Sequence, residues 1–258
     1  MTKISAYIIA YNEAEKVAAT ITSVRWADEI ILVDSWSTDN TKEIAESFGV
    51  KVVQVKFNGF GDLRNQAIAA CTCDWIFSLD ADERCTSQVK QEILEIVANP
   101  NALDVYKVPR RNFFMGRWIK HSGWYPNYRQ PQLFRSGCMH YDLNPVHEGY
   151  ILKSEKPIGI LKNAIWQIPF KNMSEVISKV NRYSTLGAQK IKEKKLSMST
   201  ALFHATWSFI KHYIFKLGVL DGWPGFIIAF QSFEGTFYRY VKAIELKKET
   251  EWKAPRID

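Results

Sequence analysis

The sequence lacks the glycine-rich phosphate-binding signatures of dinucleotide-binding and P-loop proteins. No strand-like segment is followed by G-x-G-x-x-G or by G-x-x-x-x-G-K-[ST]. The four cysteines do not form the double C-x-x-C pattern of a zinc site, so we expect reduced, structural thiols. Internal repeats and low-complexity segments are absent as well. A nucleotide, if one binds, needs another way to hold its phosphates.

A secretory leader is also missing at the amino terminus. The apolar run at 4–10 is short and is followed at once by polar and charged residues, so we expect a cytoplasmic chain. Residues 197–220 form a longer apolar stretch, but Lys211, His212 and Lys216 interrupt it, which is unfavourable at the centre of a bilayer. A helix at the membrane surface therefore fits this stretch better than a spanning helix.

Composition and charge define two halves of the chain. Hydrophobic residues make up 47% of the 258 residues, which excludes intrinsic disorder. Residues 1–150 contain 16 Lys and Arg against 18 Asp and Glu, whereas residues 151–258 contain 18 against 9. The formal charge of +7 therefore resides in the second half, and that half requires an explanation of its own.

Strand and helix patterns alternate over the first hundred residues. This alternation predicts an α/β fold with a mostly parallel central sheet flanked by helices, followed by a helical extension. We expect domains at 1–160 and 161–258, a helix capped by Ser37 or Thr38, and a hairpin arm at 129–137. The expected strands are 4–10, 29–34, 50–55 and 74–79. The expected helices are 13–24, 62–71 and one that follows the cap at Ser37 or Thr38 and ends just before Gly49.

Polar residues gather where three of these strands end. Tyr11, Asn12 and Glu13 follow the first strand, Asp34 ends the second, and the stretch "IFSLDADER" (76–84) places three acids after the fourth. Ligands of open α/β sheets bind at the carboxyl ends of strands, so these residues predict one crevice. Clustered carboxylates repel each other unless a cation neutralises them, and two carboxylates in a turn can hold a hard cation that also binds diphosphate.

Four spaced motifs resemble glycosyltransferase family 2, whose nucleotide-sugar-binding fold is called GT-A. They are "AYNEA" (10–14), "VDSWSTDNT" (33–41), "RNQAI" (64–68) and "SLDADE" (78–83). The resemblance implies that Ala10, Tyr11, Asn12, Glu13 and Asp34 contact the uracil and ribose of a UDP-sugar. It implies further that Asp82 binds Mg²⁺ or Mn²⁺, that Asp80 and Ala81 assist at the ribose or the metal, and that Arg64 lies near the diphosphate.

An inverting transferase needs a base that takes the proton from the acceptor hydroxyl. The segment "NPVHE" (144–148) supplies two candidates. We predict that Glu148 is the base and that His147 is either a metal ligand or the base itself. A histidine that is simply hydrogen-bonded within a loop is the structural alternative.

The carboxyl-terminal half resembles small bacterial glycosyltransferases that build the lipopolysaccharide core, notably the heptose β-1,4-glucosyltransferases. The segments that carry this resemblance are "KVNRYS", "KHYIFKLGVLDGWPGF" and "YRYVKAIEL". It implies transfer of a hexose, glucose from UDP-glucose, to a core sugar at the cytoplasmic face of the inner membrane. Basic residues beside aromatics also suit an anionic membrane, although the same helices could pack on the catalytic domain or form a homo-oligomer.

Three other functions are weighed against this one. The first is a glycosyltransferase with another lipid-linked or polysaccharide acceptor. The second is nucleotidyl transfer, which the missing glycine-rich loop disfavours. The third is nucleic-acid binding, suggested by the pI of 9.1. We do not expect nucleic acid as a partner, because the basic residues are interleaved with bulky apolar ones and no recognised binding motif is present.

Overall fold

The computed structural model of the chain describes residues 2–126, 128, 130–143, 149–193 and 196–247. The chain divides into two compact units. Unit 1 comprises Met1–Arg111 and Pro126–Pro169, and unit 2 comprises Asn112–Tyr125 and Phe170–Asp258. The predicted division into 1–160 and 161–258 differs from this mainly in one respect, because the segment 112–125 belongs to the second unit.

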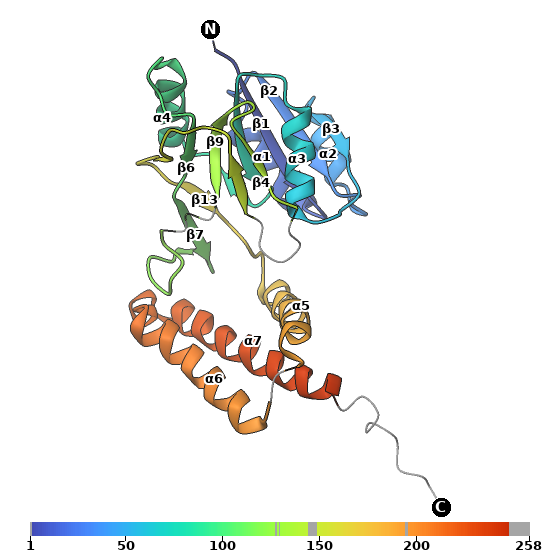
Figure 1. The fold of residues 1–258 in the computed structure, drawn as a ribbon, viewed down its shortest axis with the longest axis vertical. Helices are drawn as coiled ribbons and strands as arrows, with labels where there is room; N and C mark the ends of the chain where they lie inside the picture. The colour runs from blue at the N-terminus through green and yellow to red at the C-terminus, as the bar shows by residue number, and fades with distance from the viewer. Residues whose placement is uncertain (1, 127, 129, 144–148, 194–195, 248–258) are drawn as a thin grey trace, which may run out of the picture. The chain divides into compact units, whose positions relative to one another are not determined.

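A seven-stranded mixed sheet forms the centre of unit 1, in the order β12-β6-β9-β4-β1-β2-β3 (Figure 1). Its parallel core consists of β1 (Ile4–Ala10), β2 (Glu29–Asp34), β3 (Lys51–Gln54) and β4 (Trp75–Asp80). The other half consists of β6 (Val105–Lys107), β9 (Pro131–Arg135) and β12 (Gly159–Ile160). The predicted α/β class with a mostly parallel central sheet is confirmed.

Helices cover both faces of this sheet, which is why β1 is buried along its whole length. Alternate β1 side chains point to opposite faces: Ile8 packs in one apolar cluster and Tyr7 in the other. α1 (Ala14–Ser23), α2 (Thr41–Ser47) and α4 (Ser87–Ala98) contribute to the first cluster, and α3 (Phe60–Ala70) contributes to the second. This arrangement leaves the carboxyl ends of the strands as the place for polar groups.

Two local predictions are wrong. α2 begins at Thr41 rather than after Ser37 or Thr38, because the Asp39 carboxylate accepts hydrogen bonds from the Thr41 backbone N–H and hydroxyl. The hairpin arm predicted at 129–137 is wrong for β9, which inserts into the central sheet antiparallel to β4 and β6. A local capping contact thus sets the start of α2, whereas strands distant in the sequence set the place of β9.

Short strands and long helices complete the two units. Unit 1 adds β5 (Glu83–Arg84), β10 (Met139–Tyr141), β11 (Tyr150–Leu152) and β13 (Ile165–Gln167), and β7 (Arg110–Phe114) begins there. Unit 2 contains β8 (Arg117–Trp118), α5 (Met173–Ile191), α6 (Met198–Ile210), a π-helical turn Lys211–Phe215, a 3₁₀ turn Gly218–Asp221 and α7 (Trp223–Lys247). Across the described residues, no helix is both long enough and apolar enough to cross a membrane.

A buried carboxylate organises the loop 119–122 within unit 2. Asp221 accepts hydrogen bonds from the backbone N–H groups of Lys120 (3.1 Å) and His121 (3.1 Å) and from the Ser122 hydroxyl (2.8 Å). Both Asp221 and Ser122 are buried. A carboxylate that is buried in this way is held by the number of donors that point at it.

We expect Asp221→Ala to lower the free energy of opening of unit 2 by about 3 kcal/mol, because three donors lose a charged acceptor. Hydrogen exchange of the α7 backbone amides measures this opening directly. Glu245→Ala on the exposed surface of α7 is the matched control and should change the opening free energy by less than about 0.5 kcal/mol. Equal protection in the two variants would contradict a structural role for Asp221.

Candidate functional site

The carboxyl ends of β1, β2 and β4 lie side by side. Ala10 pairs in register with Asp34 of β2, and Ile9 pairs with Asp80 of β4. Parallel strands that share this register end at the same edge of the sheet. The structure therefore brings together the three strand ends at which the sequence places its polar residues.

Two loops at this edge are tied together through Ser37. The Ser37 hydroxyl accepts a hydrogen bond from the Asn12 backbone N–H (2.8 Å), and the Asn12 side chain accepts one from the Thr38 backbone N–H (2.7 Å). Asp34 is fully buried and accepts from the Ser37 backbone N–H (3.0 Å) and from the Ser37 hydroxyl. Asn12 adopts a left-handed backbone with φ of 55°, which asparagine tolerates better than most residues. The two loops thus form one rigid rim.

Two large aromatic side chains project from this rim into solvent. Tyr11 is 55% exposed and Trp36 is 59% exposed. An aromatic ring presented beside a polar crevice can stack on a planar base. Trp36 is a candidate that the sequence reasoning missed. Its signal was a tryptophan inside a polar loop directly after a buried strand, where a core role is not expected.

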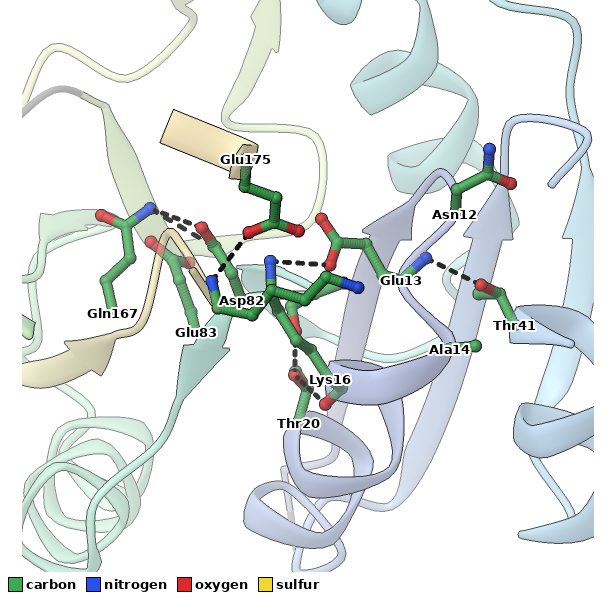
Figure 2. Close-up of polar contacts among 12 residues, drawn as sticks. Asn12, Glu13, Ala14, Lys16, Thr20, Thr41, Asp82, Glu83, Gln167 and Glu175 are labelled. Atoms are coloured by element: carbon green, nitrogen blue, oxygen red, sulfur yellow. Dashed lines mark hydrogen bonds and ion pairs between the residues drawn. The ribbon is translucent and has the colours of Figure 1, made fainter. Parts of the chain in front are cut away.

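The turn that carries Asp82 is held from two sides (Figure 2). On one side the Ala81 carbonyl accepts hydrogen bonds from the Thr20 hydroxyl of α1 and from Arg84 Nη1 (3.1 Å). On the other side the Asp82 carboxylate accepts from the Gln167 side chain (3.2 and 3.3 Å). The Asp82 position is therefore fixed by groups far from it in the sequence, and Gln167 is a second residue that sequence reasoning did not find.

The three acids of "IFSLDADER" have different partners. Asp80 pairs with Arg64 (2.7 Å), and Asp82 faces the neutral amide of Gln167. Glu83 is fully buried and forms an ion pair with Arg110. The sequence suggested a single cluster of three acids. In the structure Glu83 is in a buried ion pair, Asp80 is in a half-buried one, and the Asp82 carboxylate lies at the edge.

Glu83 also accepts hydrogen bonds from the Asp80 backbone N–H (3.0 Å) and from the Gln132 side chain (2.9 Å). The pKa of Glu83 is raised to about 7, chiefly by burial and also by the nearby Asp80 and Asp82 carboxylates, against the opposing effect of the Arg110 guanidinium. These contacts join β4, β5, β7 and β9 at one point. Glu83 is therefore a structural group, with no role in contacting a ligand.

Consecutive residues of α3 explain the motif "RNQAI". Arg64 is buried and bonds Asp80 and Ser78, with distances of 2.7 and 3.3 Å. Asn65 bonds the backbone of Tyr141 in both directions (2.8 Å each). The Arg64 side chain thus lies at the crevice, and the neighbouring Asn65 side chain attaches α3 to β10.

The two candidates for the base, His147 and Glu148, lie outside the described residues. The described residues on either side of 144–148 are close to each other: the Asp142 backbone N–H donates to the Gly149 carbonyl (3.1 Å), and the Gly149 N–H donates to the Asp142 carboxylate (3.1 Å). A Cβ at position 149 would lie 2.4 Å from an Asp142 carboxylate oxygen, so any other residue there would displace that side chain.

The charges at the edge require a cation if a diphosphate is to bind. Glu13, Asp80 and Asp82 lie here, Lys16 and Arg64 are engaged with Glu13 (3.1 Å) and Asp80 (2.7 Å), and Arg84 bonds the Ala81 carbonyl (3.1 Å). Among the described residues no group of three or more His, Cys, Asp or Glu is placed to hold a metal ion. Mg²⁺ is commonly bound by one or two carboxylates together with substrate phosphates, so Asp82 with a diphosphate fits this chemistry.

Comparison with known proteins supports a carbohydrate-transfer site. Residues 5–150 match the profile of Glycosyl transferase family 2. The chain is 29% identical to the lipopolysaccharide core biosynthesis glycosyltransferase LpsC of Rhizobium meliloti, over 99% of this chain and 96% of LpsC. It is 28% identical to an uncharacterized glycosyltransferase of Rickettsia felis, over 96% of this chain and 90% of that protein.

The chain also resembles a solved structure over less than half of its length. Glucosyl-3-phosphoglycerate synthase from Mycobacterium tuberculosis, crystallised with Mn²⁺, uridine diphosphate and glucosyl-3-phosphoglycerate, has 25% sequence identity and a TM-score of 0.38. The match covers 43% of this chain and 44% of the synthase.

We expect Arg110→Met to destabilise unit 1 by about 3 to 5 kcal/mol at pH 8, because Glu83 would stay buried without its counter-ion. The loss should shrink towards pH 5, where Glu83 is protonated in the folded variant and no longer needs Arg110. Urea unfolding at the two pH values measures both effects.

Arg111→Met, at the exposed neighbouring position, is the control and should cost less than about 0.5 kcal/mol at either pH. An Arg110→Met deficit that did not vary with pH would show that Glu83 ionisation is not its cause.

Proposed function

This chain belongs to glycosyltransferase family 2, and we propose that it transfers a hexose, glucose from UDP-glucose, to a sugar of the lipopolysaccharide core with inversion at the anomeric carbon. The observation that carries the proposal is the meeting of three strand ends, with Asp34, Asp80 and Asp82, at one edge of the sheet. The similarity to LpsC over nearly the whole of both chains supports the acceptor class.

The uridine half of the donor would bind at the rim formed by the two loops. Tyr11 and Trp36 offer exposed aromatic faces for the uracil ring, and the Asn12 amide oxygen offers an acceptor for its N–H. Asp34 is fully buried and accepts hydrogen bonds from Ser37 in the ligand-free protein, so it would contact the ribose hydroxyls only after the Ser37 side chain turned away. The bonds of Asn12 with Ser37 and Thr38 would keep the two loops together before the nucleotide binds.

The diphosphate would lie between the rim and the Asp82 turn. Asp82 would hold Mg²⁺ or Mn²⁺ together with diphosphate oxygens, and Asp80 would assist at the ribose or the metal. Arg64, which pairs with Asp80, would add positive charge near the diphosphate. When bound, such a cation stabilises negative charge on the departing diphosphate. The clamp of Thr20, Arg84 and Gln167 would keep the Asp82 carboxylate in place during transfer.

The reaction is a displacement at the anomeric carbon. The acceptor hydroxyl oxygen bonds that carbon from the face opposite the diphosphate, the bond between the carbon and the diphosphate oxygen breaks, and UDP departs with the electron pair. The proton of the acceptor hydroxyl passes to Glu148 in our assignment, with His147 as a metal ligand or as the alternative base.

We predict that UDP binds in the presence of Mn²⁺ or Mg²⁺ and that Asp82→Asn weakens this binding at least about tenfold. Loss of a residue that only orients a metal ligand costs about tenfold or more in metal affinity, and loss of the ligand itself should cost no less. Calorimetric titration of UDP, GDP, CDP and TDP, each with Mn²⁺ and with a chelator, measures nucleotide choice and metal dependence together.

Asp74→Asn is the matched control, because Asp74 is exposed just before the opposite end of the same strand, β4. It should bind UDP and metal as the unaltered protein does. Binding of UDP that is equally strong with chelator, or unchanged in Asp82→Asn, would contradict the metal site.

Glu148→Gln should retain metal-dependent UDP binding and lower turnover by about two to four orders of magnitude, the usual contribution of a positioned base. Transfer of radiolabelled glucose from UDP-glucose to purified core oligosaccharide measures turnover, and the titration above measures binding. Glu155→Gln, at an exposed position in the same unit, is the control. Normal transfer by Glu148→Gln would reassign the base to His147.

A further inference from the structure

Unit 2 presents an unusual concentration of exposed aromatic and aliphatic side chains. They lie on α6, on the two turns that follow it and on the first half of α7, and we call them the apolar surface. Phe203, Phe215 and Leu220 are 69%, 66% and 62% exposed. The other members are Leu202, Trp207, Ile214, Leu217, Val219, Trp223, Phe226 and Phe230. A contiguous apolar surface of this kind marks a binding face.

Small residues between α6 and α7 explain why the large side chains face outward. Ala201 and Ala205 of α6 and Ala229 of α7 are fully buried. A Cβ at Gly225 would lie 1.9 Å from the Gly218 carbonyl oxygen, so α7 begins against the 3₁₀ turn with only glycine between them. Alanine and glycine thus let the two helices approach closely, Phe226 packs between them against Phe209 and Tyr213, and the more exposed Phe203, Phe215 and Leu220 remain available to a partner. Water-soluble helices usually bury their large apolar side chains instead.

Stacked phenylalanines extend the apolar surface along α7. The rings of Phe226, Phe230, Phe233 and Phe237 follow one another at 6.1 to 6.2 Å with interplanar angles of 8 to 10°. Side chains at these spacings share one side of a helix. The resulting stripe is a flat apolar face, in contrast to a single protruding anchor.

The charges around this surface have one sign. Residues 196–230 contain Lys211 and Lys216 and a single acid, Asp221, which is buried and bonded within unit 2. Unit 2 as a whole contains 17 Lys and Arg against 8 Asp and Glu. An anionic partner is attracted by this distribution, whereas a second copy of the same unit would bring like charge against like charge.

We infer that the apolar surface docks on an anionic phospholipid bilayer, with α6 and the first half of α7 lying in the interface and the exposed Lys211 facing the lipid phosphates. Tryptophan and phenylalanine beside lysine are the side chains that favour the boundary between headgroups and acyl chains. The inference concerns unit 2 by itself and goes beyond the proposed sugar transfer. Vesicle binding can be measured without donor or acceptor, so either proposal can fail alone.

The test is co-sedimentation of the full chain with vesicles of phosphatidylcholine, with and without phosphatidylglycerol. The partition coefficient should be at least about tenfold higher on the anionic vesicles, since each lysine near an anionic surface adds to binding. Phe203→Ser combined with Phe215→Ser should lower it by about tenfold or more, because two large apolar side chains no longer enter the interface. Lys211→Glu should reduce the preference for anionic vesicles and leave binding to neutral ones unchanged.

Matched controls come from unit 1. Ile160→Ser removes a 56% exposed apolar side chain from β12, and Lys153→Glu reverses an exposed charge. Both should bind vesicles as the unaltered protein does, and all variants should keep the circular dichroism spectrum of the folded chain. Failure of the unaltered protein to bind, or equal binding to both kinds of vesicle, would overturn the inference. A dimer in light scattering that Phe203→Ser with Phe215→Ser dissociates would overturn it as well, in favour of a second copy.

Discussion

The ion pair between Glu83 and Arg110 is the interaction on which the crevice depends. Both side chains are buried, and the remaining Glu83 oxygen accepts hydrogen bonds from the Asp80 backbone N–H and from Gln132. One buried carboxylate thereby joins the end of β4 to β5, β7 and β9. Because Glu83 is turned into the protein, the turn before it presents Asp82 at the edge of the sheet. The Glu83–Arg110 pair thus keeps Glu83 in a structural position, while Asp82, one residue earlier, stays at the edge of the sheet.

The sequence predicts the frame of this site well, and for a physical reason. Parallel strands joined by helices end on the same edge, so the residues after 10, 34 and 80 had to meet once the alternation was recognised. The partners of the acids were beyond sequence reasoning, because Arg110 and Gln167 are 27 and 85 residues from the carboxylates that they contact. The place of β9 was equally hidden, since an antiparallel strand inserted into a parallel sheet shows the same local pattern as a hairpin arm.

The two units have opposite electrostatic character. Unit 1 concentrates acids at the sheet edge, where a hard cation and a diphosphate are the complementary ligands. Unit 2 carries the net positive charge of the chain and exposes aromatic side chains. The overall charge of +7 is therefore the sum of a slightly acidic unit 1, with 17 Lys and Arg against 19 Asp and Glu, and a basic unit 2, with 17 against 8.

The acidic edge also constrains the order of events in the proposed reaction. Lys16 and Arg64 are engaged with Glu13 and Asp80, so an incoming diphosphate without a cation would meet mainly the field of the carboxylates. A cation that arrives alone would find Asp82 and its neighbours but few further ligands among the described residues. The cation therefore supplies positive charge to the diphosphate, and the diphosphate supplies oxygen ligands to the cation. Thermodynamic linkage requires that the metal strengthens nucleotide binding by the same factor as the nucleotide strengthens metal binding. In the proposed reaction, metal and donor would therefore bind this crevice as a coupled pair, and the charge of the site would favour donors that carry a diphosphate.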